Sequence, residues 1–200
     1  MFTRSLRLST LMSITIAATA AVAHANLISY DATLDGPSES PANASPGIGS
    51  ATVDVDDTAN TLHINIVFSG LVGTTTAAHI HAATTVPLTG TAIVATTTPY
   101  FDSFPIGVTS GTYDNTLDLT LASSYNAAYI TANGGTTASA EAALLAALAA
   151  GESYVNIHTT VFPGGEIRGF LTPAPTPEPA SVALLGTSSL LLLRRRRRTA

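Results

Sequence analysis

The chain has 200 residues and a formal net charge of −5, from eight basic and thirteen acidic residues. Every basic residue is an arginine, and seven of them stand near the two ends, so residues 26–175 hold twelve acidic residues and only Arg168. This middle stretch, with a net charge of −11, lacks the basic patch that nucleic acids and anionic lipid headgroups require. It also has no cysteine, so a core must stabilise it, and about 150 residues are enough to form one.

The N-terminal segment has the three parts of a secretory signal peptide. Arg4 and Arg7 form a basic start, residues 8–22 are apolar, and Ala23-His24-Ala25 gives the small-x-small pattern of a cleavage site. We therefore predict a signal peptide over residues 1–25, removed after Ala25 by signal peptidase.

The next stretch, residues 26–172, contains short segments in which apolar and polar residues alternate. Gly, Pro, Asn and Ser clusters separate these segments, a pattern typical of half-buried antiparallel strands. The alternating segments are residues 27–34, 51–55, 62–68, 117–121, 155–157 and 167–171. We predict one all-β domain, an antiparallel sandwich or Greek-key-like barrel similar to superoxide dismutase.

Two segments of this domain depart from the alternation. Residues 138–150 are rich in Ala and Leu and are followed by Gly151, which predicts one short inserted helix. Asp54, Asp56 and Asp57 cluster at the end of a strand, where we favour a turn over the alternative of calcium ligation.

The C-terminal segment combines a Pro-rich linker, residues 173–179, with an apolar stretch and five arginines. The linker ends in Pro177-Glu178-Pro179, the apolar stretch covers residues 180–193, and the arginines are residues 194–198. Because a spanning helix needs about 20 apolar residues, this stretch suits a transient membrane stop better than a tail anchor, the less favoured alternative. The arginines are expected to stay cytoplasmic.

This order of elements resembles the PEP-CTERM sorting signal of exopolysaccharide-producing Gram-negative bacteria. The resemblance implies that residues 180–200 are held briefly in the inner membrane and cut off near Pro177-Glu178-Pro179 by an exosortase. It further implies a location at the cell surface or in the extracellular matrix, with exopolysaccharide or matrix proteins as partners.

Four blocks inside the β-domain resemble the CHRD domain, which takes its name from chordin. They are Phe68-Ser69-Gly70-Leu71, Ala77-Ala78-His79-Ile80-His81, Tyr154-Val155-Asn156-Ile157-His158-Thr159 and Gly164-Gly165-Glu166-Ile167-Arg168-Gly169. The resemblance covers nearly all of residues 27–171 and implies a β-rich fold, in agreement with the alternation. One early turn, with Gly36, Glu39 and a single Pro41, departs from the family's Gly-x-x-Glu-x-Pro-Pro pattern.

Three histidines of these blocks form a candidate metal site. His79 and His81 are two residues apart, so they share one face of a strand, and His158 occupies the polar face of a later strand. If the two strands are neighbours, three imidazoles converge as ligands for copper or zinc. The alternative is that these histidines only hydrogen-bond loop backbone and order the hairpins. We interpret His63 as an exposed strand histidine outside any site.

This arrangement is also similar to the copper site of copper-zinc superoxide dismutase, which has a His-x-His pair, a later histidine and a nearby arginine. Arg168 is the corresponding arginine, and together with Glu166 it is a candidate neighbour of the metal ligands. We prefer, however, to interpret Glu166 and Arg168 as a solvated ion pair. No bridging histidine, Cys pair or zinc loop follows, so a two-metal dismutase is disfavoured.

No residue pattern identifies a catalytic nucleophile, because no Gly-x-Ser-x-Gly elbow occurs. We therefore favour an exported, non-enzymatic binding or structural module, with one histidine-ligated copper or zinc as its candidate cofactor. The alternative is a copper-only, superoxide-dismutase-like redox enzyme that uses the same histidines.

Overall fold

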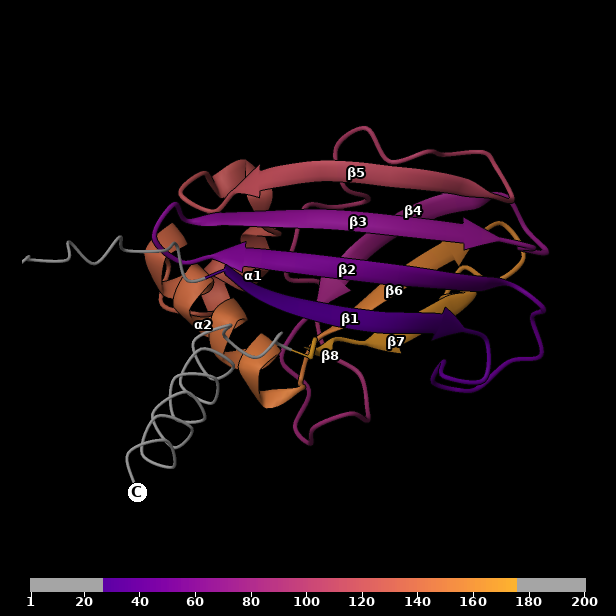
Figure 1. Cartoon of the computed structure of the whole chain (residues 1–200), viewed down its shortest axis with the longest axis horizontal. Coiled ribbons are helices and arrows are strands. Elements are labelled where there is room, and N and C mark those ends of the chain that lie inside the picture. Colours follow the sequence, from indigo (N-terminus) through magenta and orange to yellow (C-terminus); the bar gives the residue numbers. More distant parts are fainter. Residues whose placement is uncertain (1–26, 176–200) are drawn as a thin grey trace, which may run out of the picture.

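A computed structural model describes residues 27–175 (Figure 1). The predicted signal peptide with Ala25, the motif Pro177-Glu178-Pro179 and the tail, residues 180–200, lie outside the described residues. The strands are β1 Leu27–Asp35, β2 Ile48–Asp56, β3 Thr61–Ser69, β4 Thr75–His81, β5 Gly111–Asp118, β6 Tyr154–Thr159, β7 Ile167–Phe170 and β8 Thr172–Pro173. The helices are the 3-10 turn η1 Ala122–Ser124, α1 Ala127–Ala132 and α2 Thr137–Ala150. Among these described elements, none of the helices has the length and apolarity to cross a membrane.

The strands form one antiparallel sheet that folds into two layers. The strand order is β4-β6-β7-β1-β2-β3-β5, and the short β8 pairs with β1. The long strands β1, β2, β3 and β5 make one layer, and β4, β6 and β7 cross behind it at an angle (Figure 1). The layers meet where β1 pairs with β7, at Asp35 and Arg168. This architecture confirms the predicted all-β sandwich or barrel.

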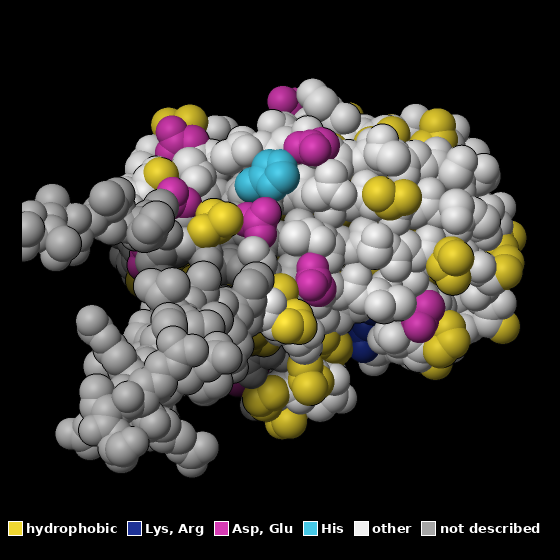
Figure 2. All heavy atoms as spheres, viewed as in Figure 1, with side chains coloured by type: hydrophobic (Ala, Val, Ile, Leu, Met, Phe, Trp, Pro, Cys, Tyr) yellow, Lys and Arg dark blue, Asp and Glu magenta, His cyan; other side chains and the backbone are white. Residues whose placement is uncertain are grey.

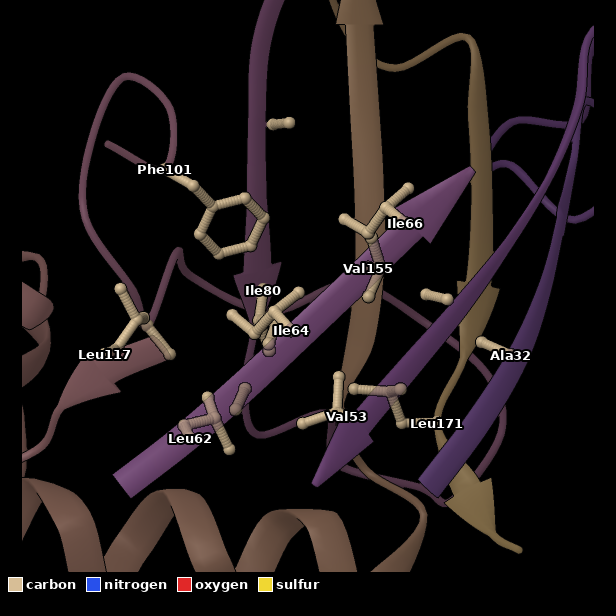
Figure 3. Close-up of a cluster of buried hydrophobic side chains, with 14 of the residues drawn as sticks. Ala32, Val53, Leu62, Ile64, Ile66, Ile80, Phe101, Leu117, Val155 and Leu171 are labelled. Atoms are coloured by element: carbon tan, nitrogen blue, oxygen red, sulfur yellow. The ribbon is translucent and has the colours of Figure 1, made fainter. Parts of the chain in front are cut away.

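The core lies between the two layers because each strand turns its apolar residues toward the other layer. Along β3, Leu62, Ile64 and Ile66 are fully buried, and they face Ile80 of β4 and Val155 of β6 across the core (Figure 3). Burying each such side chain contributes about 1.5–3 kcal/mol. The polar residues of the same strands are left on the outer surfaces of the two layers.

The end of the acidic cluster, Asp56 and Asp57, forms the turn after β2 that the sequence favoured, while Asp54 lies within β2. Asp56 accepts hydrogen bonds from the backbone N–H groups of Thr58 and Ala59, at 3.0 and 2.9 Å. Asn60 completes the turn with a φ of 53°, a conformation that Asn tolerates better than most residues. The carboxylate of Asp56 is thus already used by the turn.

The predicted inserted helix is confirmed as α2, but two shorter helical segments were not predicted. Thr136 caps α2 through a reciprocal capping box with Ser139, and Gly151 ends it in the left-handed conformation, with a φ of 70°. The helix α1 has six residues and η1 has three, which is too short for a helical period to appear in the sequence. The helices lie together at one end of the sheet (Figure 1).

Candidate metal centre

The three predicted ligand histidines converge on the outer surface of the layer formed by β4, β6 and β7. β4 pairs with β6 in the register that puts Ala77 opposite His158 and His79 opposite Asn156. Ala78 and Ile80 point into the core, so His79 and His81 point away from it, as the alternation predicted. One nitrogen of each histidine lies within 4.8 Å of the other two.

Each of the three imidazoles is oriented by a backbone carbonyl that lies near its Nδ1 atom. The pairs are His79 with Pro99 at 3.1 Å, His81 with Ala92 at 2.8 Å, and His158 with Pro163 at 2.9 Å. A carbonyl oxygen only accepts hydrogen bonds, so each Nδ1 must carry the hydrogen and donate it. The hydrogen bond therefore selects the tautomer in which Nε2 presents a lone pair, which is how metal-binding histidines are commonly held.

The Nε2 atoms consequently face one another without donors between them. The Nε2 atoms of His79 and His158 are 3.0 Å apart, and both present lone pairs, an unfavourable arrangement unless a cation lies between them. The Nε2 atom of His81 is buried and has no hydrogen-bond partner. Zinc bound tetrahedrally spaces its nitrogen ligands about 3.4 Å apart, within the range of separations in this cluster. The three residues therefore fit a copper or zinc ion.

Burial keeps these imidazoles neutral, the form that binds metals. Burial, together with the neighbouring His81 and His158, lowers the pKa of His79 to about 3. The pKa of His81 falls to about 4, mainly because of burial, although its hydrogen bond to Ala92 opposes the change. Burial also lowers the pKa of His158. No proton needs to leave these rings at neutral pH before a metal binds.

Arg168 lies near the histidines but is separated from them by an aromatic ring. The ring of Tyr154 stacks on His81 with a centroid distance of 4.6 Å and an interplanar angle of 7°. The guanidinium of Arg168 lies over the same tyrosine ring, 4.8 Å from its centroid. Arg168 donates hydrogen bonds to the carbonyls of Ser38 and Gly90, so its N–H groups are directed at loop backbone.

Glu166 is buried and contacts groups other than Arg168, so the predicted solvated ion pair is wrong. Glu166 is fully buried, and it accepts hydrogen bonds from Ser45, Thr159 and the backbone of Val72 and Gly73. It precedes the first residue of β7, so the strand alternation does not extend to it. Its hydrogen bonds instead join the β1–β2 loop, the β3–β4 loop and the end of β6.

The acidic neighbour of Arg168 is Glu39, which the sequence suggested only as part of a turn. Its Oε2 atom is 3.9 Å from Nε of Arg168, and both side chains are buried. Asn156 is buried beside them on β6, between His79 of β4 and Arg168 of β7 in the sheet register. The only sequence signal for Glu39 was its place in the Gly-x-x-Glu pattern.

His63 is partly exposed on the outer surface of the other layer, as predicted, and it bridges two carboxylates that were not predicted. Its Nε2 atom is 2.8 Å from Asp114 of β5, and its Nδ1 atom is 3.5 Å from Asp54 of β2. The hydrogen bond to Asp114 contributes most to raising the pKa of His63. Histidine and acidic side chains lie together on this face in Figure 2.

The comparisons with known proteins agree with the resemblance seen in the sequence. The family described as CHRD domain matches residues 30–171, a stretch that includes all three histidines of the candidate centre. No curated protein and no solved structure matches the chain.

Proposed function

We propose, from the premise that this chain belongs to the CHRD-domain family, that it is an exported surface or matrix module that holds one copper or zinc ion. The ligands are the Nε2 atoms of His79, His81 and His158. The observation that carries the proposal is the pair of opposed lone pairs on His79 and His158, 3.0 Å apart, beside the unpartnered Nε2 of His81. A shared cation removes the repulsion and satisfies the unpartnered atom at once.

The chemistry of the donor set supports copper or zinc over harder ions. Imidazole nitrogen is a good ligand for both metals, whereas calcium and magnesium prefer oxygen. Three neutral nitrogens leave a fourth position for water or another ligand. Such an ion would supply Lewis acidity or, for copper, redox chemistry.

Two segments outside the described residues support the export part of the proposal. Residues 1–25 have the pattern of a signal peptide, and Pro177-Glu178-Pro179 with residues 194–198 resembles a PEP-CTERM signal. Signal peptidase and an exosortase would be the processing partners, and exopolysaccharide or matrix proteins the partners at the destination. The mass of the secreted protein tests this part, because a secreted species that keeps the five arginines contradicts the sorting proposal.

A copper-only, superoxide-dismutase-like enzyme is the second candidate function. The His-x-His pair with a later histidine favours it. The position of Arg168 does not, because Tyr154 separates the guanidinium from His81. Superoxide consumption, measured on copper-loaded protein of known copper content, distinguishes an enzyme from a binding module.

Calorimetric titration of the purified protein with zinc and with copper tests the metal proposal. The wild-type protein should bind one ion, and His79→Ala or His158→Ala should weaken binding at least about 100-fold because each removes one of three ligands. His63→Ala is the matched control, a strand histidine outside the cluster, and it should bind like the wild type. Equal binding by His63→Ala and His79→Ala would show that the cluster is structural.

A further inference from the structure

Beside the histidine cluster lie two buried oxygen atoms that lack hydrogen-bond partners. They are Oε1 of Glu39 and Oδ1 of Asn156. An oxygen of a carboxylate or of an amide only accepts hydrogen bonds, so two such atoms cannot satisfy each other. An unsatisfied buried acceptor is unfavourable and needs a physical explanation.

The Glu39 carboxyl group and the Asn156 amide group both lie over the backbone of Gly165. A β-carbon added at Gly165 would lie 2.6 Å from Oε1 of Glu39 and 2.7 Å from both Oδ1 and Nδ2 of Asn156. Glycine at this position, with a φ of 130°, is what lets the two side chains close over the backbone. The carboxyl and amide groups are therefore neighbours, both buried, at the base of a surface pocket that Glu39 lines together with the hairpin turn.

Arg168 does not satisfy the carboxyl group of Glu39. Its Nε is 3.9 Å from Oε2, and it donates to the carbonyl of Ser38, while Nη1 donates to Gly90 at 3.0 Å. The guanidinium contributes positive charge nearby without a hydrogen bond. A proton on the carboxyl group would supply the missing donor and satisfy both oxygens with one O–H···O bond.

We propose that Glu39 is the proton-exchanging counter-charge of the metal centre. In the metal-free protein the carboxyl group is neutral and donates to Oδ1 of Asn156. When a divalent ion binds to the histidines, the carboxyl group releases this proton to solvent and remains as a carboxylate that balances part of the added charge. This inference rests on the proposed metal site and names how that site is coupled to pH.

The sheet register connects Glu39 to the histidines. Asn156 lies opposite His79 on one side and opposite Arg168 on the other, so it separates the metal ligands from the Glu39–Arg168 pair. With neighbouring strands about 4.8 Å apart, the carboxyl group lies roughly 10 Å from the ion position. At that distance inside a protein, a divalent cation favours a carboxylate over the neutral acid about 10- to 100-fold.

In the metal-free protein, the surroundings of Glu39 have opposite effects on its pKa. Burial raises the pKa of Glu39 to about 7, although Arg168 on β7 and hydrogen bonding from Ser40 and Asn156 act to lower it. The hydroxyl of Tyr154 on β6 is un-ionised at neutral pH, since burial raises its pKa. The carboxyl group is therefore mostly protonated just below neutral pH, where a metal ion can displace the proton.

The test is to count protons released when zinc binds. Calorimetric titration of the whole protein at pH 6.5, in buffers of different ionisation enthalpy, gives this count for the wild type and for Glu39→Gln. The glutamine keeps a donor for Asn156 but has no proton to lose. We expect the wild type to release about 0.5 to 0.7 proton more than Glu39→Gln. Asp57→Asn, which removes the same charge from an exposed turn, should match the wild type.

Zinc affinity as a function of pH gives a second readout. At pH 8 Glu39→Gln should bind zinc about 10- to 100-fold more weakly than the wild type, and at pH 5.5 the two should agree within about fourfold. Equal proton release by the two proteins, or equal affinity at pH 8, overturns this inference and leaves the metal site intact. No zinc binding by the wild type overturns both proposals.

Infrared difference spectroscopy of the wild type keeps the test independent of how well the variant folds. Adding zinc at pH 6.5 should remove absorption of a protonated carboxyl group, in an amount that matches the counted protons. An unchanged carboxyl spectrum with zinc bound would overturn the inference.

Discussion

Two outward-facing patches of the same sheet hold histidines, and they differ in what covers them. On the layer of β4, β6 and β7, loops lie over His79, His81 and His158 and present carbonyl oxygens to their Nδ1 atoms. On the layer of β2, β3 and β5, His63 is open to solvent and lies between two carboxylates. Strand alternation places a histidine outward in both cases. The loops determine whether it becomes a buried, neutral imidazole or one member of a surface ion pair.

The largest expected difference between the two patches is in acid stability. Burial holds the pKa of His79 at about 3, below its unfolded value of about 6.5. Below pH 6.5 the unfolded chain binds a proton at this position that the folded protein does not, so stability falls as pH falls toward the folded pKa. Metal-free wild type should therefore lose about 1.4 kcal/mol per pH unit more than His79→Gln between pH 6 and pH 4. Urea unfolding at several pH values measures the difference.

His63→Gln is the comparison variant for this measurement. Its free energy of unfolding should decrease as steeply as that of the wild type when the pH is lowered, because the buried histidines are unchanged. Equal slopes for His79→Gln and the wild type would contradict the claim that loop cover keeps the cluster neutral.

The next prediction concerns Glu39, which lies near the covered patch. Its folded pKa of about 7 is higher than the unfolded value, so the stability it provides is present below pH 4.5 and is lost as pH rises through 7. Glu39→Gln keeps the neutral form, and we expect it to raise the stability of the metal-free protein at pH 8 by about 2 kcal/mol. At pH 5 the gain should be much smaller. Chemical denaturation at both pH values decides this, and a gain that does not depend on pH would contradict it.

The smallest effect is expected at the exposed patch. The raised pKa of His63 means that its ion pairs stabilise the protein below pH 6.5 and lose that effect as pH rises through the folded pKa. Because His63 and Asp114 are solvent-exposed, we expect His63→Gln to change the melting temperature little at pH 6 and not at all in high salt. A large, salt-independent loss would show that this patch is more than a surface ion pair.

The shared outward orientation of the three histidines was predictable because it follows from strand alternation. Ala78 and Ile80 had to face the core, so His79 and His81 had to face outward, and His158 followed by the same reasoning. The pairing of β4 with β6 was the one condition that the alternation did not supply. It joins segments that are far apart in the chain.

The surroundings of the site could not be predicted because loops provide them. The carbonyls of Ala92, Pro99 and Pro163 carry no side-chain signal, since every residue has one. Glu39 meets Arg168 across 129 positions of sequence, and nothing in its local turn indicates that contact. The prediction that Glu166 shares an exposed face with Arg168 was wrong for a simpler reason. Glu166 precedes the strand that contains Arg168, so the alternation of that strand does not apply to it.

The three carbonyls that orient the histidines belong to separate stretches of loop, near residues 92, 99 and 163. An ion held by the histidines would therefore link these stretches, because each histidine would bind the ion through Nε2 and a loop carbonyl through Nδ1. The chain has no cysteine that could form covalent bridges. The ion would act as a reversible cross-link that needs no oxidising enzyme to form. Because proteases attack loops first, the supply of metal would then set how long the protein survives them.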